Sequence, residues 1–460
     1  MTLAASRLHG GRDALVPGTF MAFFLALAVP LCVSAGQPGA ASAAEPLLAS
    51  ASELTPQEVI DNPQCRMHAA QDAAVVVLIE SDVARFLVVD GDGPVYGGDL
   101  SFPASGYRLG RREDGSLIAG FFGVLSHAAG TVPMPPEPAV IFLDGQVIYE
   151  HHDVVRLGIA PDGSSFYAVE TVTEDSFDLL IRNLVQGKEY RHDIGNTFKS
   201  WGLELCYSAN YSPDYSEVHL VPGCPGDEGG VGTHYFYKTG GGAPRTIRIE
   251  DRESRRDEAV LVSSTEGYFV EDERVERNEP RFRIAKRQYV WPEGNSRDVW
   301  SFVTTHNFSF WTISVWSSGA WLTLITIPSG LPQTWDRKDW RLLVVNGATG
   351  EIVFDFPRVS EKEQRERLGD FLNPATVPPG IGNVSGHRIS ANELLIHRSF
   401  SRDRETSAYD VYDMDTLSDN AKPLFRIPIN RRWNNSCASL NYPRALAERK
   451  GRLAYVSVRK

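Results

Sequence analysis

The segment Ile159-Ala-Pro-Asp-Gly-Ser-Ser-Phe-Tyr-Ala-Val169 decides the fold, because it sets a turn directly before an apolar strand. Gly163 accepts the positive φ of a tight turn, and Ser165–Val169 is apolar and β-prone. Further strands are expected over Asp178–Arg182 and, after a turn at Gly187, over Glu189–Asp193. The segment therefore predicts an antiparallel unit built from strands that follow one another in the chain.

The same order of turn and strands recurs elsewhere. A second copy has Ser212-Pro213-Asp214 before strands at Glu217–Val221, His234–Lys238 and Thr246–Ile249. A third has Ala391-Asn392 before strands at Glu393–His397, Tyr409–Asp413 and Pro423–Ile427. The interval from Asp162 to Asn183 equals that from Asn392 to Asp413. This recurrence indicates an internal repeat.

Repeated antiparallel units of about 40–50 residues are typical of propeller blades. We therefore predict an all-β fold: a single β-propeller of about seven or eight blades over residues 73–460. An N-terminal signal segment over residues 1–43 and a spacer with a short helix over residues 44–72 are expected before it. Two β-sandwich domains are the alternative, but the recurring Asp/Asn spacing favours the propeller.

Two segments also resemble bacterial propeller families. Ile159–Val169 is similar to the strand-turn-strand of TolB-type repeats, and Leu342-Leu-Val-Val-Asn-Gly-Ala-Thr-Gly-Glu-Ile-Val-Phe354 is similar to a quinoprotein-propeller repeat. The resemblance implies the β-propeller architecture. Quinoprotein dehydrogenases repeat a Trp-containing motif in every blade, and this chain does not, so their cofactor is not implied. No cofactor is expected.

The chain ends and the cysteines suggest how a ring would close. The strand Val75–Ile79 is expected to add to the sheet that contains Arg452–Val456, which would hide two sheet edges. Four cysteines follow the leader, and an even number in an exported chain indicates disulfides. We expect the pairs Cys206–Cys224 and Cys65–Cys437, of which the second would lock the seam. Four buried free thiols are the alternative.

The N-terminus has the layout of a secretory signal peptide. Arg7 and Arg12 precede the apolar stretch Thr19–Val29, and Ala41-Ser42-Ala43 resembles a cleavage site. The expected location is therefore extracytoplasmic, either periplasmic or secreted. An uncleaved membrane anchor is the alternative; a lipoprotein is disfavoured, because the bulky Leu31 precedes Cys32.

Charge and motifs narrow the function. The net charge of -12 argues against a nucleic-acid partner. Sequence patterns for a nucleophile elbow, a zincin, a P-loop and an EF-hand are all missing from the chain. Ser385 lies in the wrong glycine context for a nucleophile. His151 and His152 would point to opposite faces of a strand, so no metal site is expected.

Tryptophan is concentrated in one part of the chain. Seven of the nine tryptophans lie between Trp291 and Trp340, where buried strands account for most of them. Trp335 and Trp340 flank Arg337 in a loop-like segment, and aromatic side chains anchor binding sites. These three residues are the predicted binding residues.

These observations favour a monomeric exported propeller that binds a protein, a peptide or a glycan. A propeller enzyme, such as a hydrolase or lyase with a site assembled from several blades, is the first alternative. A membrane-tethered accessory subunit is the second, if the leader is retained. The fold alone does not separate them.

Cleavage of the leader is the first testable prediction. We expect the mature protein to begin between about Ala35 and Ala44, because a small-residue site follows the apolar stretch. Mass spectrometry of the N-terminus of the native protein measures this. A native chain that begins at Met1 would contradict cleavage and favour an anchor.

Overall fold

The computed structural model describes part of the unit Leu47–Lys460. The described residues are 48–49, 59, 65–80, 83–104, 106–123, 137–173, 176–195, 207–222, 232–249, 258–272, 281–291, 295–304, 307–316, 319–327, 341–356, 383–390, 392–399, 407–418, 421–429 and 444–457. The predicted signal segment 1–43 lies outside them. Among these residues, no helix is long and apolar enough to cross a membrane.

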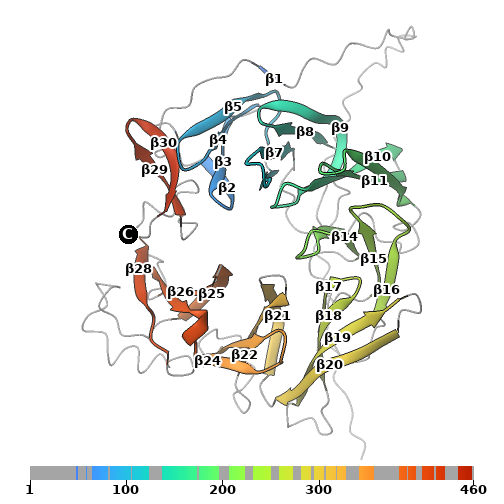
Figure 1. The fold of residues 1–460 in the computed structure, drawn as a ribbon, viewed down its shortest axis with the longest axis vertical. Coiled ribbons are helices and arrows are strands. Elements are labelled where there is room, and N and C mark those ends of the chain that lie inside the picture. The colour runs from blue at the N-terminus through green and yellow to red at the C-terminus, as the bar shows by residue number, and fades with distance from the viewer. Residues whose placement is uncertain are drawn as a thin grey trace, which may run out of the picture. The chain divides into compact units, whose positions relative to one another are not determined.

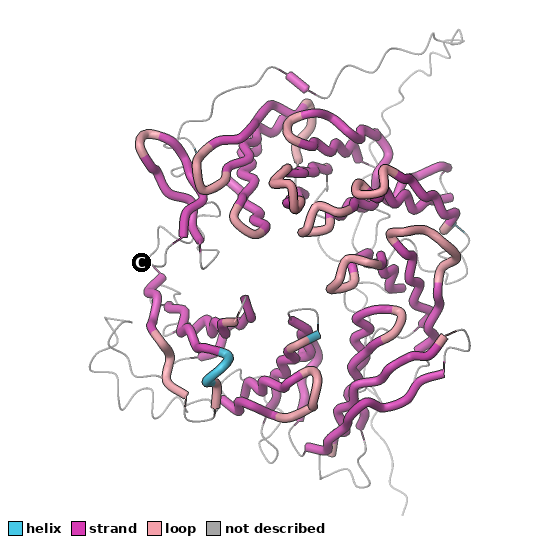
Figure 2. Tube along the Cα trace, viewed as in Figure 1, coloured by secondary structure: helices cyan, strands magenta, loops and turns pink. Residues whose placement is uncertain are grey.

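The described strands form seven antiparallel sheets, which follow one another in chain order (Figures 1 and 2). The first sheet contains β1 (Leu48–Ala49), β2 (Cys65–Ala70), β3 (Ala73–Glu80), β4 (Val83–Val89) and β5 (Pro94–Leu100). The second contains β6 (Gly106–Arg111), β7 (Leu117–Phe122), β8 (Glu137–Leu143), β9 (Gln146–Ile159), β10 (Ser165–Thr173), β11 (Ser176–Asn183) and β12 (Lys188–Asp193).

The other sheets are smaller. The third contains β13 (Tyr207–Tyr211), β14 (Glu217–Pro222), β15 (Gly232–Lys238) and β16 (Arg245–Ile249). The fourth contains β17 (Glu258–Ser263), β18 (Glu266–Asp272), β19 (Phe282–Val290) and β20 (Asn295–Thr304). The fifth contains β21 (Asn307–Trp316), β22 (Trp321–Ile327), β23 (Arg341–Asn346) and β24 (Ile352–Phe356). The sixth contains β25 (Asn383–Ser390), β26 (Glu393–Ser399), β27 (Ser407–Asp413) and β28 (Phe425–Ile429), with the 3-10 helix η5 (Met414–Thr416). The seventh contains β29 (Arg444–Arg449) and β30 (Arg452–Ser457).

This is a β-propeller arrangement, but the predicted number of blades is wrong. Seven or eight blades were predicted. Among the described residues, five sheets have the four or five strands of a separate blade. The second sheet has seven strands because β9 runs without a break from its pairing with β8 to its pairing with β10. The seventh sheet has only two strands among the described residues.

The turns form as their residues predict. Gly163 has φ +66°, which an L side chain rarely adopts. Asp162 supports the same turn, because its Oδ1 accepts hydrogen bonds from the backbone N (3.0 Å) and Oγ (2.7 Å) of Ser164. The predicted strand Ser165–Val169 follows as part of β10 and pairs with β11, as expected.

Strands in the middle of a sheet, such as β3, bury both faces, which explains their continuous apolar sequences. In β3, Ala73, Val75 and Val77 pack in a cluster with the second sheet. The alternate residues Ala74, Val76 and Leu78 pack in a cluster with Tyr455 of β30. Successive side chains of a strand point to opposite faces, so each such strand needs a neighbouring sheet on each side.

Hydrophobic clusters link each sheet to the next and return to the first. One example joins the fourth and fifth sheets, through residues such as Phe282 and Leu324. Similar clusters join the first sheet to the second, the second to the third, and the third to the fourth. Others join the fifth sheet to the sixth, the sixth to the seventh, and the seventh back to the first. One more cluster lies between the two halves of the second sheet. Side-chain packing therefore connects the sheets in a cyclic order.

The seam between the chain ends differs from the prediction. Val75–Ile79 does not pair with Arg452–Val456, since β3 lies between β2 and β4, and β30 pairs with β29 among the described strands. The two sheets instead meet through side chains, and the backbone N of Tyr455 donates to the backbone O of Asp90 at 2.8 Å. Packing, rather than strand pairing, closes this part of the ring.

The first sheet also begins before Ala73, because β2 pairs along its length with β3. Cys65, at the start of β2, is completely buried. Cys206, Cys224 and Cys437 lie outside the described residues, so both disulfide pairings stay predictions.

The seam gives a stability prediction. Tyr455→Ala removes a side chain that is 1% exposed, and truncating a buried aromatic residue costs about 3–5 kcal/mol of unfolding free energy. Urea unfolding measures the loss. Leu424→Ala, at a side chain that is 57% exposed, is the control and should change stability by less than about 0.5 kcal/mol. Equal effects of the two changes would contradict the packed seam.

Candidate functional site

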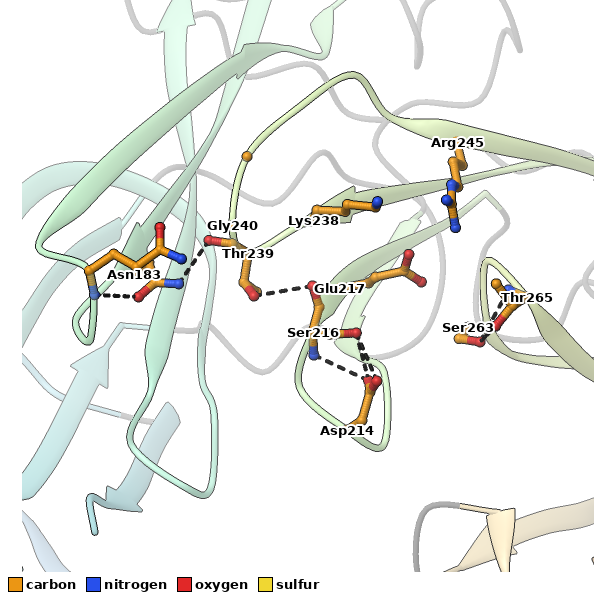
Figure 3. A pocket seen from close by; sticks show the side chains of 12 residues that line it. Asn183, Asp214, Ser216, Glu217, Lys238, Thr239, Gly240, Arg245, Ser263 and Thr265 are labelled. Atoms are coloured by element: carbon orange, nitrogen blue, oxygen red, sulfur yellow. Dashed lines mark hydrogen bonds between the residues drawn. The ribbon is translucent and has the colours of Figure 1, made fainter. Parts of the chain in front are cut away.

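A cavity of about 570 Å³ lies where turns of the second, third and fourth sheets meet (Figure 3). The second sheet contributes Asn183 and Gln186, and the fourth contributes Ser263 and Thr265. The third sheet supplies the other lining residues, which are Asp214, Ser216, Glu217, Lys238, Thr239, Gly240, Gly241 and Arg245. No aliphatic or aromatic side chain is among these residues, so the cavity is a polar site.

A buried carboxylate joins the third sheet to the fourth at this cavity. Glu217 begins β14 and is 5% exposed. One of its oxygens accepts from the backbone N of Ser264 at 2.7 Å, and the other accepts from Ser264 Oγ at 2.6 Å. A buried charge needs such partners to offset its loss of hydration. Glu217 and Ser264 therefore form a fixed connection between the two sheets.

Arg245 extends this connection into the cavity wall. Its Nη1 donates to Ser264 Oγ at 2.9 Å, and its guanidinium lies 5.4 Å from the ring centre of Trp291. The indole N of Trp291 donates to the backbone O of Ser264 at 2.7 Å. Contacts on two sides hold the guanidinium in one orientation, which is the condition for a preorganised binding group.

The opposite wall contains a second carboxylate. Asp214 Oδ1 accepts from Ser212 Oγ at 2.6 Å and from the backbone N of Ser216 at 3.2 Å. Burial alone would raise the pKa of Asp214, but these hydrogen bonds outweigh it and lower the pKa below its ordinary value. Asp214 is therefore an anionic acceptor at neutral pH.

A third wall connects the second and third sheets. The side-chain N of Asn183 donates to the backbone O of Thr239 at 3.2 Å, and Thr239 Oγ1 donates to the backbone O of Ser216 at 3.1 Å. Lys238 is exposed beside this wall, and its side chain extends towards Arg245 in Figure 3. Among the described residues, no hydrogen bond or ion pair engages its Nζ.

The cavity wall offers both hydrogen-bond donors and acceptors. Both carboxylates already accept hydrogen bonds from serines, and no histidine is among the described residues that line the cavity. The hydroxyls here bond to carboxylates, to backbone or to each other. Lys238, Arg245 and Gln186 offer donors, and Asp214 offers an acceptor.

Two buried histidines lie in the same interface between the third and fourth sheets. Nε2 of His219 is 2.9 Å from Nδ1 of His234, and the His219 ring stacks on Phe236 with 4.2 Å between ring centres. Burial, together with the neighbouring His234, holds the pKa of His219 well below its ordinary value. The pair was not predicted from the sequence, although each histidine lies in a predicted strand, His219 in Glu217–Val221 and His234 in His234–Lys238.

The predicted binding residues Trp335, Arg337 and Trp340 lie outside the described residues. Their role stays a prediction. Other tryptophans of the cluster have structural contacts: the indole N of Trp300 donates to the backbone O of Gly347 at 3.0 Å. That of Trp316 donates to Thr323 Oγ1 at 2.8 Å.

His151 and His152 lie within β9, and Nδ1 of His151 accepts from the backbone N of Asp153 at 3.1 Å. Nothing is described of the Ser385 side chain. Within the described part of the chain, no three potential metal ligands gather.

No protein-family model and no curated protein matches the chain. Solved structures similar to it include β-propeller proteins. TolB from Acinetobacter baumannii is 14% identical, with 84% of this chain and 86% of that chain covered and a TM-score of 0.30. The β-propeller domain of the trilobed protease from Pyrococcus furiosus is 10% identical, with coverages of 78% and 85% and a TM-score of 0.35. A eukaryotic initiation factor is 12% identical, with coverages of 79% and 88% and a TM-score of 0.40.

The histidine pair predicts a pH dependence. The unfolded chain takes up a proton at His219 near pH 6.5, whereas the folded chain resists it. The stability contributed by neutral His219 is thus complete above pH 6.5 and decreases as the pH falls below it. His219→Gln should make the fall in unfolding free energy between pH 7 and 5 shallower, as measured by urea unfolding.

The exposed His152 provides the control, and His152→Gln should leave the slope unchanged. An unchanged slope in His219→Gln would show that the buried pair does not carry the pH dependence.

Proposed function

We propose that this chain is an exported β-propeller that binds a glycan in the cavity between the second, third and fourth sheets. The observation that supports it most directly is the preorganised chain Arg245–Ser264–Glu217, which sits beside the exposed Lys238. A cavity of about 570 Å³ lies within the size range of small-ligand sites.

The chemistry of the lining favours a glycan over a peptide. Sugar hydroxyls both donate and accept, and the cavity offers carboxylate, amide, hydroxyl and cationic groups in close succession. No aliphatic or aromatic residue is among the described lining residues, so an apolar peptide side chain would find no matching side chain there. Arg245, whose guanidinium lies over the Trp291 ring, adds a fixed donor to the wall.

The predicted export of the chain supports the same proposal. The leader over residues 1–43 would place the mature chain in the periplasm or outside the cell, where glycans are accessible. If the leader were retained, the propeller would be tethered to the membrane, and the cavity would still be the binding site.

A binding assay with matched variants tests the proposal. The mature protein is screened on a glycan array, and the affinity of the strongest glycan is measured by calorimetry. Lys238→Ala should weaken binding at least about tenfold, because it removes a charged hydrogen-bond donor. Arg248→Ala is the control: Arg248 is exposed on β16 and does not line the cavity, so affinity should not change.

Three results would overturn the proposal. Binding of peptides but not glycans would replace the ligand class. Equal affinities of Lys238→Ala and the unaltered protein would move the binding site elsewhere. Turnover of the bound ligand, abolished in Asp214→Asn, would replace the binding function with an enzymatic one.

A further inference from the structure

We propose that the glycan bound in the cavity is acidic, and that Lys238 and Arg245 together bind its oxyanion group. This inference rests on the proposed function and adds the substrate class to it. Both cationic side chains line the cavity, Lys238 at the end of β15 and Arg245 at the start of β16. We call these two residues the cationic pair.

Strand register puts the cationic pair on one face of the third sheet. Arg245 lies directly opposite Phe236 in the pairing of β15 with β16, so these two side chains share a face. Side chains two residues apart on a strand also share a face, so Lys238 points the same way as Phe236. Phe236 packs against the fourth sheet. Figure 3 shows the Lys238 side chain extending towards Arg245 on this side.

The carboxylate nearest to Lys238 in register is used elsewhere. Glu217 lies directly opposite Lys238 in the pairing of β14 with β15, a position from which opposite charges can form an ion pair. Both oxygens of Glu217 instead accept hydrogen bonds from Ser264, in the turn between β17 and β18. Among the described residues, no carboxylate forms an ion pair with Lys238 or with Arg245.

The second carboxylate of the cavity is also engaged by serines. Ser212 Oγ donates to Asp214 Oδ1 at 2.6 Å, and Ser216 Oγ donates to Asp214 Oδ2 at 2.8 Å. Figure 3 shows Asp214 beside Ser216 and apart from the cationic pair. An oxyanion held by the cationic pair would therefore leave Asp214 to accept a hydrogen bond from a sugar hydroxyl of the same ligand.

The Arg245 guanidinium keeps donors for a ligand. Within the described part of the chain, its hydrogen bond runs from Nη1 to Ser264 Oγ, and its contact with Trp291 fixes its orientation. Nε and Nη2 can therefore donate to an oxyanion, and a guanidinium group binds a carboxylate through two parallel hydrogen bonds. The exposed Lys238 adds a second charge on a long side chain that can reach the same group.

The fourth sheet shows how a lysine is neutralised within this fold. Lys286 Nζ lies 3.0 Å from a carboxylate oxygen of Glu266 and donates to the backbone O of Gly347 at 3.1 Å. Lys238 has no such partner among the described residues, and like charges on one face of adjacent strands repel each other. An oxyanion bound by Lys238 and Arg245 would remove this repulsion. The ligand is therefore a glycan with an oxyanion group, either a uronate carboxylate or a sulfate.

Matched ligands test the inference on the mature protein. Oligomers of galactose and of glucose are compared with their uronates and with their sulfate esters, first on the glycan array and then by calorimetry. An acidic oligomer should bind at least about tenfold more tightly than its neutral parent. Lys238→Gln should weaken the acidic ligand about tenfold more than the neutral parent. Lys238→Arg, which retains the charge, should keep the preference for the acidic ligand.

Lys422→Gln is the control for net charge, because Lys422 is exposed, precedes β28 in the sixth sheet and does not line the cavity. It should leave the preference unchanged. Tighter binding of uronates than of sulfate esters, or the reverse, would support the inference and identify the oxyanion. If neutral parents bind as tightly as acidic oligomers, or if Lys422→Gln lowers the preference as much as Lys238→Gln does, the inference is wrong and glycan binding stands. If no glycan binds, the inference and the proposed function both fail.

Discussion

Strands in the middle of sheets, such as β3 and β23, are apolar on both faces, and the rest of the structure depends on this constraint. In β23, Leu342 and Val344 pack against the sixth sheet, while Leu343 and Val345 pack against the fourth. A sheet of this composition is stable only between two others, because side chains alternate between its faces. Each sheet therefore needs a neighbouring sheet on each side. For the first sheet, the hairpin β29–β30 covers one of the two faces.

The polar site depends on the same packing. Glu217 and Arg245 lie at the end of the interface whose interior contains Phe236 and Phe269. The Glu217–Ser264 hydrogen bonds therefore form only when the third and fourth sheets are in contact. The His219–His234 pair belongs to the same interface, so acid pH and the proposed ligand would act on one structural element.

Local chemistry made the strands and turns predictable. Asp162-Gly163 and the apolar run that follows define β10, and the three repeats locate strands such as β14 and β26. The number of separate sheets was not predictable, since nothing between Gln146 and Ile159 signals that β9 would pair on both sides without a break. Closure through Tyr455 was also missed, because side-chain packing between distant segments leaves no spacing in the sequence.

The candidate site was missed for a related reason. Its residues come from three sheets and are separated along the chain by strands that never enter the cavity. One signal was available in the sequence: Glu217 stands at the start of an apolar strand, directly before Val218. A carboxylate that is buried with such a strand needs a hydrogen-bond partner. The tryptophan cluster is the more visible pattern in the sequence, but the indole N of Trp300 bonds across to the fifth sheet and that of Trp316 bonds within the fifth sheet.

Native-state hydrogen exchange tests the cyclic packing most directly. The amides of β3 and β30 are followed in the mature protein at increasing urea concentrations. If packing on Tyr455 closes the ring, the first sheet and the hairpin β29–β30 should lose protection together, in one cooperative step. Loss of protection in β29–β30 while β3 stays fully protected would show that the hairpin is an appendage, and would contradict the account.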